Sequence, residues 1–284
     1  MSDKDWDLVI KPQNKLLDFK IKELWSYKDL LALFVKRDFI SIYKQTILGP
    51  LWFFIQPILS TIMFTIVFGT IGKLSTDGMD DAKPLFYLAG LTLWNYFADC
   101  LTKTSETFIK NQNVFGKVFF PRLIVPLSIV VSSLIKFGIQ FLLFTALWAY
   151  YFVYGNNIIH PTFAMLLVPL LVLMMAGLSL GFGIIFSSIT TKYKDMVFLL
   201  SFGVQLLMYA SSVVIPLSAI SPNYRWIFKL NPMVNIIETF KYAFLGVGAF
   251  NWLDLTYSFV FMIVLLFIGI IIFNKVEKSF MDTI

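Results

Sequence analysis

The stretch from Thr162 to Ile189 reads TFAMLLVPLLVLMMAGLSLGFGIIFSSI and contains no Asp, Glu, Lys or Arg. A helix needs about twenty mostly apolar residues to cross the hydrocarbon core of a bilayer. In lipid, each backbone polar group has to be paired within the protein, and a helix pairs these groups within one segment. The stretch therefore predicts a membrane-spanning helix, and it decides the class of fold.

Five other stretches have the same character, so the sequence predicts an all-α, polytopic membrane protein with six transmembrane helices. The predicted spans are residues 48–71, 84–101, 125–154, 162–189, 196–215 and 253–273. Only 14% of the 284 residues are charged, compared with about 25% in a typical soluble domain. The mean hydropathy of +0.78 is too high for one soluble core. We expect a transmembrane domain over residues 47–284, preceded by a cytoplasmic segment over residues 1–46.

The Lys and Arg residues are distributed unevenly between the two sides that these spans define. Eighteen of the 23 fall on or near the side of residues 1–46, and five fall on the other side. Cytoplasmic loops of membrane proteins carry an excess of basic residues, so both termini are predicted to be cytoplasmic. The net charge of +6 does not indicate nucleic-acid binding, because the basic residues flank the apolar runs.

Two segments outside the spans have an amphipathic pattern. From Trp25 to Gln45, apolar residues recur at helical spacing between Lys and Arg, which predicts a helix lying in the inner membrane interface. A plain cytoplasmic helix that binds a soluble partner is the alternative. Between the fifth and sixth spans, short helices are predicted at 224–230 and 234–245, separated by Asn231-Pro232. They could dip into the outer leaflet as two short re-entrant helices, or form a surface hairpin.

The predicted cytoplasmic loop between the second and third spans carries its own signal. Residues 111–122 read NQNVFGKVFFPR and are long enough for a short helix at the membrane surface. Pro121 would end that helix, because proline lacks an amide hydrogen and clashes with the preceding turn. Pro126 then suits the first turn of the third span.

A few polar and small residues within the spans carry information. Asp99 lies one helical turn from Lys103, which favours a local ion pair near the inner interface over a transport role. Gly177 and Gly181 form a small-xxx-small face, which predicts close packing between helices. Apart from Asp99, the spans lack the acidic and His chains expected of a proton-driven carrier.

The sequence lacks the motifs of an enzyme. No G-x-x-x-x-G-K-[ST] phosphate loop is present, and no zinc-binding spacing occurs. Cys100 and His160 are each the only residue of their kind, and Asp80-Asp81 is the only adjacent acidic pair. The position of this pair in a short polar loop favours a solvated turn. No catalytic residue and no metal ligand are expected, and energy for transport would have to come from another subunit.

Several motifs, taken in order along the chain, resemble one family. They are Tyr43-Lys44-Gln45-Thr46-Ile47-Leu48-Gly49-Pro50-Leu51-Trp52, Gly90-Leu91 with Trp94-Asn95-Tyr96-Phe97, Lys117-Val118-Phe119-Phe120-Pro121-Arg122, Lys192-Tyr193-Lys194-Asp195, and Asn231-Pro232 with Glu238 and Lys241. Over residues 25–284 they resemble the permease subunits of bacterial polysaccharide ABC exporters, which serve O-antigen, capsule and teichoic acid export. In the last two motifs Lys stands where Arg is commoner in the family.

The resemblance implies a half-transporter. Two copies of the chain would line one pore as a homodimer, and two ATP-binding cassette subunits would dock on its cytoplasmic face and use ATP and Mg²⁺. The implied ATPase-coupling residues are Asn111, Lys117, Phe119, Phe120, Pro121 and Arg122. The implied interface or gate helix carries Phe34, Lys36, Arg37, Tyr43 and Lys44. The implied outer gate carries Asn231, Pro232, Glu238 and Lys241.

The resemblance also implies a cargo, a lipid-linked polysaccharide such as O-antigen, and a place in the bacterial inner membrane. Aromatic rings stack on the apolar faces of sugars, and the candidates for lining the channel are Tyr43, Trp52, Phe53 and Trp94. The cations of the gate helix are placed for the pyrophosphate of the lipid carrier or for anionic membrane lipids. A related ABC exporter of capsule, teichoic acid, lipids or drugs is one alternative. An integral membrane glycosyltransferase is another, for which only Asp80-Asp81 offers acidic groups on an aqueous loop.

Overall fold

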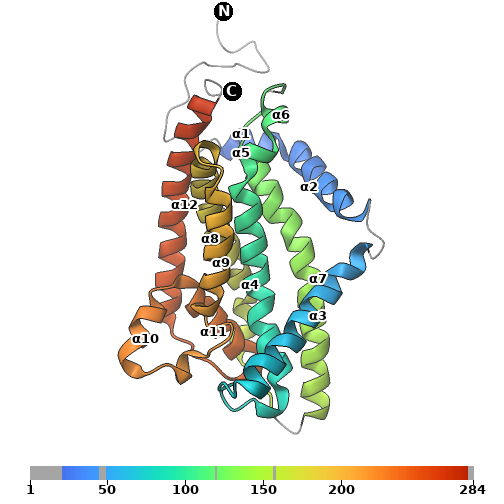
Figure 1. Cartoon of the computed structure of the whole chain (residues 1–284), viewed down its shortest axis with the longest axis vertical. Helices are drawn as coiled ribbons and strands as arrows, with labels where there is room; N and C mark the ends of the chain where they lie inside the picture. The colour runs from blue at the N-terminus through green and yellow to red at the C-terminus, as the bar shows by residue number, and fades with distance from the viewer. Residues whose placement is uncertain (1–20, 45–48, 119, 156–157, 281–284) are drawn as a thin grey trace, which may run out of the picture.

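The computed structural model describes residues 21–44, 49–118, 120–155 and 158–280, and every regular element in these ranges is helical. This confirms the predicted all-α class. Figure 1 shows an elongated bundle whose long helices run side by side along the long axis. Helices α2 (Lys28–Tyr43) and α6 (Gln112–Phe115) lie at one end of the bundle, which we call the α2 end. Helices α10 (Pro222–Lys229) and α11 (Pro232–Leu245) lie toward the opposite end.

Four helical segments in the described part of the chain are long and apolar enough to span a membrane. They are Trp52–Ile71, Ile124–Tyr154, Phe163–Lys192 and Trp252–Val276, which correspond to the predicted first, third, fourth and sixth spans. The elements that form them are α3 (Trp52–Phe64) with the π-helical η2 (Thr65–Ile71), α7 (Ile124–Tyr154), η4 (Phe163–Leu167) with α8 (Val168–Lys192), and α12 (Trp252–Phe280). A multi-pass membrane protein follows from these four segments alone.

The predicted second span forms a helix, α4 (Lys83–Ser105), that is not one of these four segments. Most of its side chains are buried, because it packs against α3, α7, α8 and α11 in the middle of the bundle (Figure 1). A helix that other helices cover can carry polar side chains that lipid would not tolerate. Thr92, in the middle of α4, is fully buried and donates its hydroxyl hydrogen to Leu88 O at 2.7 Å.

The sequence predicts a fifth span over residues 196–215, but α9 (Met196–Tyr209) has only 14 residues, so the predicted length is wrong. Such a helix is about 21 Å long, which is shorter than the hydrocarbon core of about 30 Å. The backbone carbonyl groups that follow α9 accept hydrogen bonds from side chains far along the sequence. Asn231 Nδ2 donates to Ala210 O at 3.0 Å, and Lys241 Nζ donates to Ser212 O at 2.6 Å. These bonds give the carbonyl groups partners outside the helix, so the helix ends early.

The small-xxx-small face of α8 packs against α12. A Cβ atom added at Gly177 would collide with Met262, and one added at Gly181 would lie 2.9 Å from Leu265 Cγ. Glycine at both positions therefore lets the two helices approach more closely than any larger residue would. The predicted role of these two glycines in helix packing is confirmed.

Replacing Gly183 with alanine is expected to destabilise the protein. The added Cβ would lie 2.6 Å from Thr104 Cβ, which is buried on α4 and cannot move without the backbone, and overpacking costs about 1–3 kcal/mol. Gly138→Ala on α7 is the matched control, because nothing lies within 4 Å of its added Cβ. Alanine gains about 1 kcal/mol of helix propensity at either position. Thermal unfolding of both purified variants measures the difference, and equal stability would refute this close packing.

The predicted N-terminal helix over residues 25–45 forms two helices, α1 (Ile21–Ser26) and α2, which meet at Tyr27. Helix α2 lies against α7 at an angle to the bundle (Figure 1). Its Phe34 is buried, whereas Lys36 and Arg37 are exposed, as expected for an amphipathic helix. Gln45, at the end of the predicted helix, lies outside the described residues.

The predicted end of the short loop helix at Pro121 is wrong. The structure has two shorter helices, α5 (Thr107–Lys110) and α6, and α6 ends before Gly116. Glycine has the weakest helix propensity apart from proline, so the local sequence favours an end at this point. Asn111 separates the two helices, and its Nδ2 donates to Thr107 O at 2.9 Å.

The two helices predicted between the fifth and sixth spans are confirmed as α10 and α11. Asn231 caps α11, because its Oδ1 accepts a hydrogen bond from Met233 N at 3.1 Å and Pro232 occupies the first turn. Gly246 ends the helix in the left-handed conformation with φ +75°. Three short 3-10 turns complete the fold: η1 (Gly49–Leu51), η3 (Asp80–Ala82) and η5 (Leu217–Ala219).

Candidate functional site

The predicted coupling residues divide into a buried and an exposed set. Asn111, Phe120, Pro121 and Arg122 are buried within the chain, whereas Lys117 is exposed, as is its neighbour Val118, which is not among the predicted residues. Phe119 lies outside the described residues. The exposed part of this loop comprises Lys117 and Val118 together with Gln112, Asn113 and Gly116.

The buried set joins the coupling loop to α2. The Phe120 ring centroid lies 5.7 Å from that of Phe34 on α2 and 5.7 Å from that of Phe115 on α6. The Arg122 guanidinium lies over the Phe115 ring, 5.6 Å from its centroid. Such tilted aromatic pairs and cation–π contacts are favourable when buried. We call these four residues the aromatic joint; it brings together two sites that the sequence predicts separately.

The predicted cations of the gate helix point mostly outward. Lys36 and Lys44 are exposed, and Arg37 lies 4.7 Å from the centroid of the Phe34 ring while its Nη2 lies 2.8 Å from Asp38 Oδ1. The side chain of Tyr43 lies outside the described part of the structure. Arg37 is thus the gate-helix cation that contacts the aromatic joint directly.

The structure separates the remaining candidates for lining the channel. Trp52, at the start of α3, is 50% exposed, whereas Trp94, in the middle of α4, is 3% exposed. Trp94 packs on Phe97 with ring centroids 5.4 Å apart. Phe53 is also buried. Among these three, Trp52 has the most exposed ring, Phe53 lines a pocket between α2, α4 and α7 although it is mostly buried, and the burial of Trp94 indicates packing.

Two of the predicted outer-gate residues, Glu238 and Lys241, are fully buried on α11 and hold loops in place. Glu238 Oε1 accepts a hydrogen bond from Leu217 N at 3.3 Å, and its Oε2 accepts one from Ala249 N at 3.0 Å. Lys241 Nζ, besides its bond to Ser212 O, lies 3.7 Å from the centroid of the Phe86 ring. The two side chains therefore fix the segments before and after α11 to α11 itself.

Glu238→Ala is expected to lower the stability of the protein, because it leaves the buried Leu217 N–H without an acceptor, at about 1–3 kcal/mol, and also removes the acceptor of the Ala249 N–H. Glu238→Gln keeps one acceptor oxygen and should give an intermediate loss. Asp81→Ala removes an exposed carboxylate and serves as the control. Thermal unfolding of the detergent-purified variants measures the order of stability. A Glu238→Ala protein as stable as the control would contradict the bracing role.

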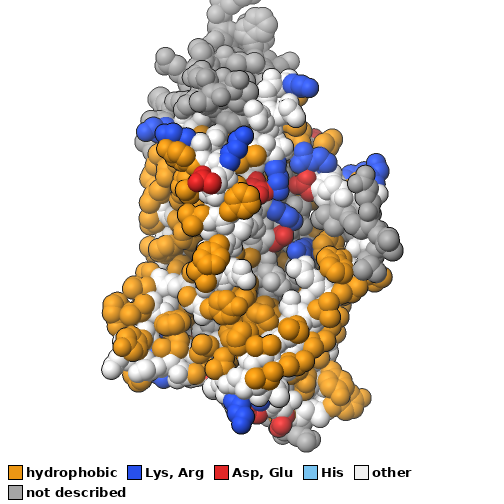
Figure 2. All heavy atoms as spheres, viewed as in Figure 1, with side chains coloured by type: hydrophobic (Ala, Val, Ile, Leu, Met, Phe, Trp, Pro, Cys, Tyr) orange, Lys and Arg blue, Asp and Glu red, His pale blue; other side chains and the backbone are white. Residues whose placement is uncertain are grey.

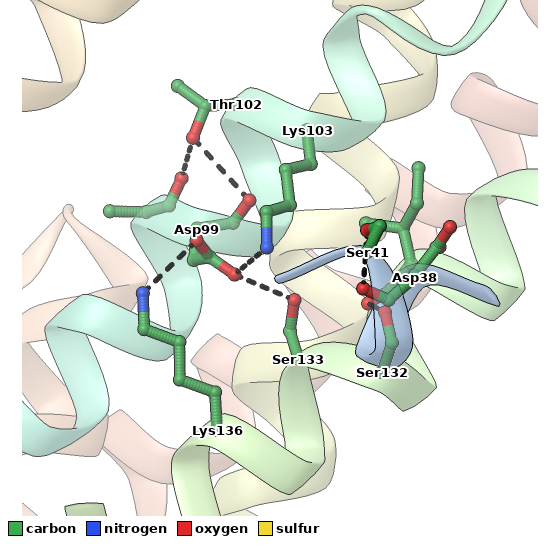
Figure 3. A network of polar contacts seen from close by, with 10 residues as sticks. Asp38, Ser41, Asp99, Thr102, Lys103, Ser132, Ser133 and Lys136 are labelled. Atoms are coloured by element: carbon green, nitrogen blue, oxygen red, sulfur yellow. Dashed lines mark hydrogen bonds and ion pairs between the residues drawn. The ribbon is translucent and has the colours of Figure 1, made fainter. Parts of the chain in front are cut away.

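The predicted ion pair between Asp99 and Lys103 is confirmed, with Lys103 Nζ 2.8 Å from Asp99 Oδ2. Figure 3 shows that α7 completes the site from the other side. Lys136 Nζ lies 3.3 Å from Asp99 Oδ1, and Ser133 Oγ donates to Asp99 Oδ2 at 2.8 Å. Sequence reasoning missed this pairing between helices. The signal that could have found it is the spacing of Ser133 and Lys136, which puts both on one face of α7.

Apolar helices around a buried central helix, with an amphipathic helix docked at one end, define a multi-pass membrane protein. Within the described ranges, no three His, Cys, Asp or Glu side chains gather closely enough to hold a metal ion. The chain belongs to the ABC-2 type transporter family, because a model of this family matches residues 29–245. The match includes the gate helix, the coupling loop and both outer helices. The protein is a permease subunit of this type of exporter.

Relatives with similar length extend the match over nearly the whole chain. An O-antigen export system permease protein, RfbA, of Klebsiella pneumoniae is 27% identical over 256 residues, which cover 89% of this chain and 94% of the relative. An RfbA of Myxococcus xanthus is 26% identical over 226 residues, covering 79% and 83%. A polysialic acid transport protein, KpsM, of Escherichia coli is 25% identical over 259 residues, covering 89% and 95%.

Proposed function

We propose that this chain is the membrane-spanning subunit of an ATP-driven exporter that moves a lipid-linked, O-antigen-like polysaccharide across the bacterial inner membrane. Two copies of the chain would enclose the pathway. Two ATP-binding cassette subunits would bind ATP and Mg²⁺ and supply the energy. The chain itself would have no ATPase site and no catalytic residue.

The observation that carries this proposal is the similarity along 79–89% of the chain to proteins named for O-antigen export or polysialic acid transport. Both names refer to the movement of a polysaccharide. Because the similarity is not confined to one motif, it includes the elements that would contact the cargo and those that would contact the ATPase.

The aromatic joint supports a route for force between the ATPase and the pore. Lys117 and Val118 are exposed and would contact the ATP-binding cassette subunit. Phe120, two residues after Val118, is buried in the aromatic joint. A displacement of the coupling loop would be transmitted to α2 through the packed rings of the aromatic joint. Closely packed side chains move together as a rigid unit and do not deform gradually. Helix α2 would then act as the inner gate.

Six crossings and a re-entrant outer pair remain the proposed topology. The fifth crossing would combine α9 with the irregular residues 210–216, of which 211–214 are buried. Irregular backbone at membrane depth is tolerated where protein covers it. Helix α11 is buried along nearly all of its length, which supports a place within the outer leaflet. Large exposed side chains on α9 and α10 offer a surface for the second copy: Phe198, Phe202, Tyr224 and Trp226.

Depletion of the chain in its host cell tests the function. A surface polysaccharide is expected to disappear from intact cells while its lipid-linked precursor accumulates and becomes accessible to a glycan-binding probe only after permeabilisation. Re-expression of the wild-type chain should restore the surface signal. Unchanged surface glycan after depletion would refute the export role, and accumulation of a different molecule would identify another cargo.

A cysteine pair tests the orientation. Ser221→Cys, before α10, is expected to react with a membrane-impermeant maleimide added to intact spheroplasts, whereas Lys194→Cys, between α8 and α9, should react only after lysis. The wild-type background should stay unlabelled, because Cys100 is fully buried. The reverse labelling pattern would overturn the cytoplasmic placement of the α2 end.

A further inference from the structure

The α2 end of the bundle holds a pocket of about 330 Å³ between α2, α4 and α7, a volume in the range of small-ligand sites. We call it the lysine pocket. The cations that line it are Arg37 from α2, Lys103 from α4, Lys110 from α5 and Lys136 from α7. Asp38 is the carboxylate that lines it, and Asp99 lies beside the pocket, paired with two of the lining lysines. The proposed coupling route through the aromatic joint uses none of these residues except Arg37.

The carboxylates do not balance these cations. Lys103 Nζ and Lys136 Nζ share the single carboxylate of Asp99, at 2.8 and 3.3 Å (Figure 3). Arg37 pairs with its neighbour Asp38 at 2.8 Å, and Lys110 pairs with Glu106, which does not line the pocket. In the described part of the chain, the group around Asp99 therefore has one positive charge in excess. An anion entering the pocket would compensate this charge.

The depth of the pocket indicates where such an anion would come from. Residues 137–154 of α7, which follow Lys136, contain no charged residue, and a helix of this length extends about 27 Å. This is close to the hydrocarbon thickness of about 30 Å, so Lys136 lies at one boundary of the hydrocarbon. On α4, residues 84–98 are uncharged up to Asp99, which puts Asp99 at the same boundary.

The surface of the molecule agrees with this depth. Figure 2 shows a broad hydrophobic band and, toward the α2 end, a cluster of Lys, Arg, Asp and Glu side chains at the edge of the band. Phosphate groups of lipids lie just outside the hydrocarbon, at the level of this edge. Lysine side chains that start at the boundary can extend their ammonium groups to that level.

We propose that the lysine pocket binds a phosphate group carried by a membrane lipid. Lys103 and Lys136 donate charge-assisted hydrogen bonds to the phosphate oxygens, and Arg37 approaches from the side of α2. A bound phosphate therefore joins α2 to α4 and α7, and the lipid composition regulates the position of α2. The proposal rests on the proposed orientation of α2 at the membrane surface.

Lipid binding by the full-length protein tests this proposal directly. Native mass spectrometry of the purified protein, titrated with phosphatidylglycerol or with phosphatidylcholine of the same acyl chains, is expected to show preferential retention of phosphatidylglycerol. The variant Asp99→Asn/Lys103→Gln/Lys136→Gln should lower this affinity about tenfold or more, because it removes both donors without stranding a carboxylate. Lys194→Gln makes the same change in net charge at an exposed site and should bind like the wild type.

A second variant keeps the test decisive if the triple variant does not fold. Asp99→Asn alone removes the internal competitor for both lysines and should tighten phosphatidylglycerol binding. Equal retention of the two lipids, unchanged affinity of a folded triple variant, or unchanged or weaker binding by Asp99→Asn would each overturn the proposal.

Competition with farnesyl diphosphate distinguishes the two lipids that could carry the phosphate. Displacement assigns the pocket to the diphosphate of an isoprenoid carrier, and no displacement assigns it to bilayer phospholipid; either result supports a lipid-borne phosphate.

Discussion

Replacing Lys117 and Val118 with serine is expected to abolish most export, by roughly tenfold or more, while the chain remains folded and inserted. Both residues are exposed on the loop that follows α6, and Val118 presents 57% of its surface although it is apolar. An exposed apolar residue beside a cation fits a contact with a partner subunit. The measurements are surface glycan on whole cells and ATP hydrolysis by the purified complex, which should continue without export.

The matched control for this variant lies at the other end of the bundle. Ile71→Ser/Lys73→Ser makes nearly the same chemical change at two exposed residues, the last residue of η2 and one just beyond it. It should leave export unchanged, because no ATPase contact is proposed there. Full export by the Lys117→Ser/Val118→Ser chain would remove the loop from the coupling route. A broader replacement that includes Phe120 would be ambiguous, because Phe120 is buried in the aromatic joint.

Trp94→Ala is expected to remove most of the folded protein. The side chain is 3% exposed and packs on Phe97, and truncation of a buried Trp costs about 3–5 kcal/mol. That loss is comparable to the whole stability of many domains, about 5–15 kcal/mol. Quantitative blotting of membranes and thermal unfolding of the purified variant measure the effect.

Trp52→Ala is the comparison that separates packing from cargo contact. Its ring is half exposed, so its loss should lower glycan export more than it lowers protein abundance. Export and abundance are measured on the same cells for both variants. If the Trp94→Ala protein is abundant and stable but defective in export, Trp94 contacts the glycan and is not only a packing residue.

The spans that could be predicted from the sequence are those set by local composition. The uncharged run ending at Ile189 is long enough to be a helix in any membrane protein, and α8 follows it closely. The end of α9 could not be predicted in this way. It depends on donors from Asn231 and Lys241, which lie 21 and 29 residues from the carbonyl groups they contact. Sequence patterns that reflect nearest neighbours cannot include such bonds.

In the candidate site, too, features set by local sequence could be predicted, whereas features set by contacts between distant residues could not. The coupling loop and the outer helices could be located from motifs, because the order of the motifs along the chain is itself specific. The burial of Phe120 and Arg122 could not be predicted, because it depends on α2 covering the loop. Trp52 and Trp94 both lie in recognisable motifs, and only the neighbours of α4 decide that Trp94 is the buried one.

The glycines of α8 have a consequence for the order in which the protein is built. Their partner helix α12 begins about sixty residues after the end of α8, so it is synthesised later. Until Met262 and Leu265 are synthesised, Gly177 and Gly181 lack the side chains that cover them in the folded protein. A nascent chain that stops before Trp252 therefore lacks the helix that buries this glycine face in the completed protein.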